Sequence, residues 1–185
     1  DSTDVGSALA AQDTAATLSS AGDAFRLRML IHVGVSDLFT SEASLKLQFA
    51  QQSGTCDTAF SGETYADVTA ATVIAYNNNA TPADGTALTV NASDPTHGGD
   101  TIVNQTYEEA NNFTNSQGVV NLGQDGKWDF SLIDNGAAAG TAYCLRAVKS
   151  DGTVLDTYTV VPQITTASTA SLTFTVSTNN FPTIT

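Results

Sequence analysis

Short stretches in which apolar and polar residues alternate recur along the chain, and a period of two residues predicts β-strands. The strongest is AFRLRMLIHV, residues 24–33, which places its apolar side chains, from Phe25 to Val33, on one face. Residues 44–51, 127–133, 141–148 and 153–161 alternate in the same way, and Asp151-Gly152 predicts a hairpin turn between the last two. Weaker strand patterns occupy residues 8–18, 73–76, 88–90, 102–105 and 119–122.

Helical periodicity is nearly absent, and the long polar segments 77–86 and 91–101 are rich in residues that favour turns. Seven to ten short strands separated by such loops predict an all-β sandwich. No internal repeat or domain boundary precedes Pro162. We therefore expect one β-sandwich domain over residues 1–164, followed by a linker and a C-terminal strand over residues 165–185.

The segment Thr141-Ala-Tyr143-Cys-Leu-Arg146-Ala-Val148, followed by Gly152, resembles the penultimate strand of fibronectin type III and related immunoglobulin-like modules. This resemblance implies an immunoglobulin-like β-sandwich with long loops and an extra terminal strand. In its general sequence character, the chain is similar to modules of prokaryotic cell-surface or filament proteins. It departs from the family in its greater length and in the position of Cys144, directly after the tyrosine.

Composition limits the classes of partner. Only 14% of the residues are charged, Thr and Ala are the commonest, and the formal net charge is −13. Such a surface repels phosphate backbones, so we expect no nucleic-acid partner. No apolar run is long enough to span a membrane. The Thr-rich, Lys-poor composition is typical of secreted β-proteins, so we expect an extracellular or cell-surface location.

The chain has two cysteines, Cys56 and Cys144. An even pair in such a chain favours one disulfide in an oxidising compartment, the alternative being two free buried thiols. Since Tyr143 and Leu145 share one strand face, Cys144 falls on the other, and we expect the bond to clip the loop of residues 51–60 onto the sheet.

Catalytic groups are scarce, so we expect no enzyme, no cofactor and no metal site. His32 lies mid-strand and is expected at a surface or rim, whereas His97, in DPTHGGD, has acids nearby but gives only a weak metal signal. Calcium is the other metal considered, because residues 91–100 and 123–129 are rich in oxygen ligands, although neither has the EF-hand spacing.

Glycans and binding faces are further candidates. Four Asn-x-Ser/Thr sequons, at Asn79, Asn91, Asn104 and Asn112, are possible glycosylation sites, although a chain rich in Asn and Thr also produces sequons by chance. Trp128 alternates with core positions and is expected to pack. Three tyrosines are expected to be freer and able to line a binding face: Tyr65, Tyr76 and Tyr107.

The last strand pattern, with Leu172, Phe174 and Val176 on one face, follows a linker of small residues from Thr165 to Ala170. It can fold back on its own domain, begin a further module, or add to the sheet of a neighbouring subunit as a donor strand. The N-terminal segment of residues 7–18 is the alternative donor.

Two functions follow from these expectations. The first is a structural subunit of an extracellular filament, pilus or surface layer, a head-to-tail homopolymer joined by β-strand exchange. The alternative is a monomeric adhesin or carbohydrate-binding module of a larger surface protein.

Overall fold

The structure is a computed structural model, and it describes residues 7–169. Within this range the chain is all-β, without an α-helix, as the alternation predicts. The strands of the described range are β1 (Ala16–Thr17), β2 (Ala24–His32), β3 (Leu45–Gln51), β4 (Ala66–Asp67), β5 (Ile74–Tyr76), β6 (Thr101–Glu108), β7 (Gln124–Asp134), β8 (Ala142–Lys149) and β9 (Gln163–Thr165).

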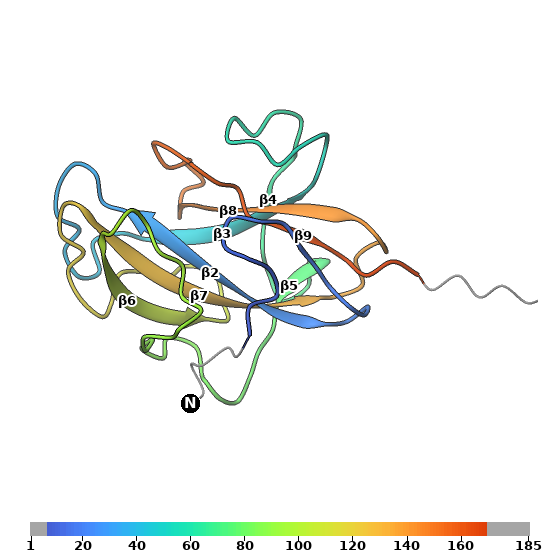
Figure 1. The fold of residues 1–185 in the computed structure, drawn as a ribbon, viewed down its shortest axis with the longest axis horizontal. Helices are drawn as coiled ribbons and strands as arrows, with labels where there is room; N and C mark the ends of the chain where they lie inside the picture. The colour runs from blue at the N-terminus through green and yellow to red at the C-terminus, as the bar shows by residue number, and fades with distance from the viewer. Residues whose placement is uncertain (1–6, 170–185) are drawn as a thin grey trace, which may run out of the picture.

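The strands form two sheets that pack face to face (Figure 1). One sheet has five strands in the order β1-β9-β8-β3-β4. The other is built around β7, which pairs with β2 along one side and with β5 and β6 along the other. Two of the pairings are parallel, β1 with β9 and β6 with β7.

The core lies between the sheets and follows the predicted alternation. Trp128, Phe130 and Leu132 of β7 are at most 1% exposed, so the tryptophan is a packing residue as expected. Phe113, from the loop after β6, packs edge-on against Phe130 with ring centroids 4.9 Å apart. A Cβ atom on Gly126 would lie 2.7 Å from the Trp128 ring, so the packing of this tryptophan requires glycine there.

The prediction of a strand over residues 153–161 is wrong. Only Val154 bridges to Val148 of β8, and the chain then leaves the sheet until β9 begins. The hydroxyl of Tyr158 donates to the Ala147 carbonyl at 2.6 Å and accepts from the Leu155 N–H at 3.0 Å. The Tyr158 hydroxyl thus makes hydrogen bonds to the backbone that a neighbouring strand would otherwise make. The alternation of apolar and polar residues does not reveal such a contact.

The disulfide expected from the sequence is present between Cys56 and Cys144. Cys144 lies on β8 and is fully buried, and Cys56 belongs to the loop between β3 and β4. The bond therefore ties this loop to the five-stranded sheet.

Replacing both cysteines with alanine should lower the free energy of unfolding by about 4–5 kcal/mol, because the bond closes a loop with a sequence separation of 88. Denaturant unfolding of the two proteins measures this difference, and reduction of the unchanged protein should reproduce it. Equal midpoints would show that the bond does not constrain the unfolded chain.

The buried carboxyl of Glu108 should make stability depend on pH. Burial raises the pKa of Glu108 from 4.5 to about 7. Since the folded-state pKa is the higher one, the stabilisation is complete below pH 4.5 and is lost as the pH rises through 7. Relative to Glu108→Gln, the unchanged protein should lose about 3 kcal/mol between pH 4 and pH 8. Parallel pH profiles of unfolding for the two proteins would contradict this.

Candidate functional sites: an open strand edge and a histidine–aspartate cluster

The first candidate site is the side of β2 that faces away from β7, which we call the open β2 edge. β2 pairs with β7 over all nine of its residues, and no other strand of residues 7–169 pairs with it. Val33 exchanges backbone hydrogen bonds with Gly123 and Gln124. Because such bonds alternate along an antiparallel ladder, the even-numbered residues from Ala24 to His32 direct their N–H and C=O groups toward the open side.

The inner face of β2 is incompletely covered. Phe25, Leu27, Met29 and Ile31 pack against the core but remain half-buried. By contrast, Phe130 of β7 is fully buried. A further strand beside β2 would bury these side chains more completely, as a covering loop or helix also can.

A groove of about 540 Å³ continues from the C-terminal end of β2 and runs between the two sheets. Its lining includes the apolar side chains Ile31, Val33, Val35, Leu38, Leu45 and Leu155. Val35, which belongs to this lining, is 85% exposed. The open edge therefore leads into a groove of mixed lining, in which acidic side chains such as Asp37 and Glu42 stand beside the apolar ones.

The outer face of β2 carries a network of buried ion pairs. Arg26 and Arg28 both donate to the carboxylate of Asp129, which is fully buried on β7. Asp94 in turn accepts from Arg28 and from the fully buried Lys127. Burial lowers the pKa of Lys127, while the hydrogen bond from Lys127 to Asp94 opposes that change. The network thereby fixes the loop around Asp94 onto the sheet.

That loop also carries half of the second candidate site, the His–Asp cluster, which consists of His32, His97, Asp100 and Asp125. His32 ends β2 and is the direct cross-strand partner of Asp125 on β7. His97 and Asp100 flank a turn in which Gly98 and Gly99 have φ of +54° and +96°. This left-handed backbone suits glycine, and it brings the two side chains to the same side of the turn.

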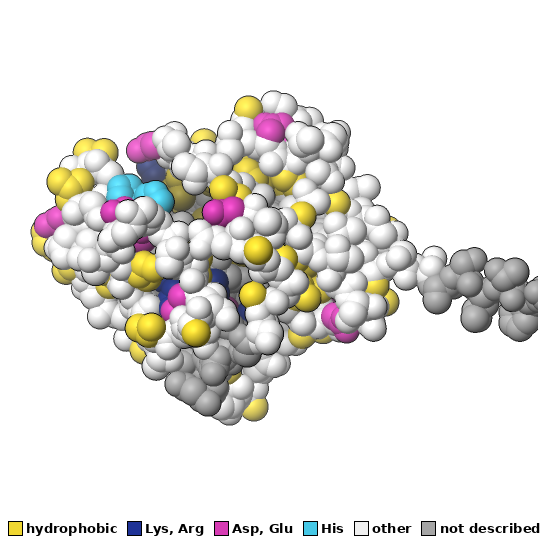
Figure 2. All heavy atoms as spheres, viewed as in Figure 1, with side chains coloured by type: hydrophobic (Ala, Val, Ile, Leu, Met, Phe, Trp, Pro, Cys, Tyr) yellow, Lys and Arg dark blue, Asp and Glu magenta, His cyan; other side chains and the backbone are white. Residues whose placement is uncertain are grey.

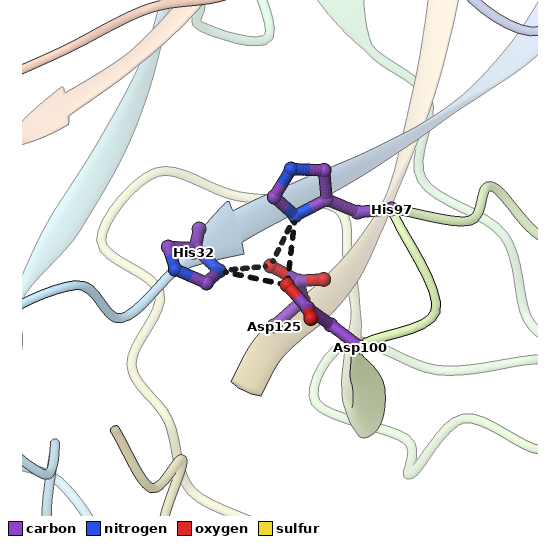
Figure 3. A group of neighbouring side chains, drawn as sticks. All are labelled: His32, His97, Asp100 and Asp125. Atoms are coloured by element: carbon purple, nitrogen blue, oxygen red, sulfur yellow. Dashed lines mark hydrogen bonds and ion pairs between the residues drawn. The ribbon is translucent and has the colours of Figure 1, made fainter. Parts of the chain in front are cut away.

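The four side chains converge on one point (Figure 3). Nδ1 of His32 lies 2.9 Å from Asp125 Oδ1 and 3.4 Å from Asp100 Oδ2. Nδ1 of His97 lies 3.3 Å and 3.2 Å from the same two oxygens. In Figure 2 the two imidazoles sit together on the surface next to acidic side chains.

Asp125 is the buried member of the cluster. It is 0% exposed, and its Oδ2 atom is buried without a hydrogen-bond partner. Within residues 7–169 no lysine or arginine forms an ion pair with it; its Oδ1 atom contacts the two imidazoles, which carry a charge only when they are protonated. A buried carboxylate held in this way needs positive charge from the cluster itself.

The cluster does not follow from the sequence pattern, although three of its residues fall in the two oxygen-rich segments, 91–100 and 123–129. From the sequence, His97 has only the acids of its own loop as neighbours, and Asp125 is a candidate for a calcium ligand or for one of a pair of carboxylates with Asp129 or Asp134. His32 was expected at a rim, and its side chain is indeed 41% exposed. The missing signal was the β2–β7 register, which places His32 opposite Asp125.

The tyrosine prediction is wrong in two of three cases. Tyr76 and Tyr107 are 6% and 0% exposed and belong to the core. Tyr65 is half-buried, and the Arg146 guanidinium stacks on its ring at 3.9 Å. The tyrosines therefore do not form a shared open face for a sugar.

The sequons differ in their surroundings. Asn112 is exposed, whereas Asn91 and Asn104 are half-buried. The Nδ2 atom of Asn79, where a glycan would attach, already donates to the hydroxyls of Tyr107 and Ser131 at 2.6 and 2.9 Å. Of the four, Asn112 thus has the surroundings that suit a glycan best, and glycosylation stays a prediction.

The C-terminal strand residues Leu172, Phe174 and Val176 lie outside the described residues. The start of the expected linker lies inside: Thr165 ends β9, and Thr166 and Ala167 are 1% and 8% exposed. Thr166 is held by its N–H, which donates to the Thr141 carbonyl at 3.0 Å. The chain is therefore anchored to the five-stranded sheet as far as Ala167.

Substituting Asp129 with asparagine should lower the free energy of unfolding by about 3 kcal/mol, because two guanidinium groups lose their buried counter-charge. The matched control is Asp67→Asn, which removes the more exposed ion pair with Lys46 and should cost at most about 1 kcal/mol. Equilibrium unfolding in denaturant with the disulfide intact measures both. Equal losses would mean that the Asp129 network contributes no more than a surface pair.

Comparisons with known proteins give no indication of function, so the geometry of the two candidate sites is the basis for a proposal. No helix with the length and apolar character of a membrane span occurs in residues 7–169. No family model matches the chain, and the searches of curated proteins and of solved structures return no match.

Proposed function

We propose that this protein is a structural subunit of an extracellular filament, pilus or surface layer, which polymerises head to tail by β-strand exchange. The donor is the C-terminal strand with Leu172, Phe174 and Val176, and the acceptor is the open β2 edge of the next copy. The two sheets belong to an immunoglobulin-like sandwich that receives its missing edge strand from a neighbour.

The observation that carries this proposal is the incomplete edge of the β7 sheet. β2 is nine residues long, about 30 Å at the usual strand rise, and has a half-buried apolar inner face. An added strand gains main-chain hydrogen bonds along such an edge while alternate side chains enter pockets. The pattern from Leu172 to Val176 has this alternation.

The placement of the ends supports exchange between copies rather than within one. The described chain leaves β9 at one end of the long axis, whereas β2 runs toward the opposite end (Figure 1). The groove that extends the open edge is lined by residues at this far end of β2, including Ile31 and Val33. A donor at one end and a groove at the other make a heterologous contact, which repeats into a filament when the rotation does not close.

The disulfide and the low content of charged residues support an extracellular location. The alternative, a carbohydrate-binding module, loses part of its basis because Tyr76 and Tyr107 are core residues. We therefore prefer the structural subunit.

Two complementary variants test the exchange. Removing residues 171–185 deletes the donor. Leu30→Pro removes an N–H that faces the open side, and proline is tolerated at a strand edge where no ladder bond is lost. Each variant alone should fail to form polymers by light scattering and negative-stain microscopy, whereas an equimolar mixture should form dimers. The matched control Leu30→Val should polymerise like the unchanged protein.

Each outcome decides the proposal. Polymers that persist without residues 171–185 would sink it. So would a mixture that stays monomeric although both variants are folded by circular dichroism, because a strand that completes its own domain predicts that result.

A further inference from the structure

We propose that the His–Asp cluster is a binding site for a divalent first-row transition-metal ion, with Zn²⁺ as the best-suited ion. The cluster contains both histidines of the chain, although 64 residues separate them, and it joins the end of β2, the start of β7 and the loop before β6. This inference does not depend on the filament proposal.

The spacing of the ligand atoms fits tetrahedral coordination. One ligand atom from each residue lies within 4.8 Å of all the others. The four nitrogen–oxygen distances across the cluster are 2.9, 3.2, 3.3 and 3.4 Å. A tetrahedral Zn²⁺ ion with bonds of about 2.0–2.2 Å places its ligand atoms about 3.3–3.6 Å apart. An ion at the centre therefore needs only small side-chain shifts.

The charges of the site also favour a bound cation. Two carboxylates balance one divalent ion when both imidazoles are neutral ligands. Asp125 is 0% exposed, and its Oδ2 atom is buried without a partner at the cluster. The neighbouring bases Arg26, Arg28 and Lys127 are already paired with other acids. A metal ion supplies positive charge at the point where the chain provides no lysine or arginine.

The donor set selects the class of metal. Ca²⁺ and Mg²⁺ prefer six or more oxygen ligands, whereas imidazole nitrogen favours zinc and its neighbours. Both histidines present Nδ1 to the cluster, and their Nε2 atoms point away from the carboxylates (Figure 3). This leaves each Nε2–H able to donate to water or to an outer-shell partner, as metal-bound histidines do. Four protein ligands make the site structural, not catalytic.

The test uses the full chain with its disulfide intact, treated with EDTA, dialysed and titrated with ZnCl₂ by calorimetry. We expect one Zn²⁺ per chain, a higher melting temperature, and no displacement by millimolar CaCl₂. His97→Ala and Asp100→Asn should each weaken Zn²⁺ binding at least tenfold; both side chains are on a surface loop, 51% and 33% exposed. The matched control, Asp156→Asn, changes an exposed acid outside the cluster and should bind as the unchanged protein does.

Co²⁺ gives an independent readout, because tetrahedral coordination produces strong visible absorption that the two loop variants should lose. The absence of saturable one-to-one Zn²⁺ binding would overturn the proposal and leave a hydrogen-bonded quartet in which the histidines carry the charge. Unchanged affinity in both loop variants would overturn it as well.

Discussion

The antiparallel pairing of β2 with β7 is the contact on which the rest of the structure depends. It extends over nine residue pairs without a bulge. The core-facing side and the outer face of this pair make different contacts. Toward the core it presents Trp128, Phe130 and Leu132, which form the centre of the packing. On the outer face it aligns two arginines with Asp129. A slip of one residue would exchange the two faces and place charged groups in the core, so the hydrophobic pattern and the ion pairs specify the same register.

Charge is the second constraint, because the chain has 19 acidic and only six basic residues. A buried carboxylate is tolerated only when it is paired or hydrogen-bonded. Three basic residues are concentrated on the outer face of the β7 sheet, where they neutralise Asp129 and Asp94. Glu108 is buried away from them, and its carboxyl responds by a raised pKa. Asp125 forms no ion pair with a lysine or arginine of the described residues, and its Oδ1 atom contacts the imidazoles of His32 and His97 instead.

The sequence predicted what depends on local periodicity and failed where a contact between distant residues decides. Alternation located β2, β3, β7 and β8, because each buries one face against the other sheet. It also predicted a strand after Gly152, where the Tyr158 hydroxyl instead bonds to Ala147 and lets the chain leave the sheet. The disulfide followed from composition and cysteine count. The His–Asp cluster could not be found in this way, because its members are neighbours only through the β2–β7 register and the turn at Gly98-Gly99.

The two candidate sites meet at His32. This residue ends β2, contributes Nδ1 to the His–Asp cluster, and lines the groove that extends the open edge. The other three cluster residues are not part of the groove lining. A strand entering the groove and an ion held by the cluster would therefore both restrict the same short segment, from His32 to Val35. If both proposals hold, occupation of one site would change the affinity of the other, because thermodynamic coupling between two sites is reciprocal. The two sites are joined by contact as well as by the backbone, since His32 itself belongs to the cluster and to the groove lining.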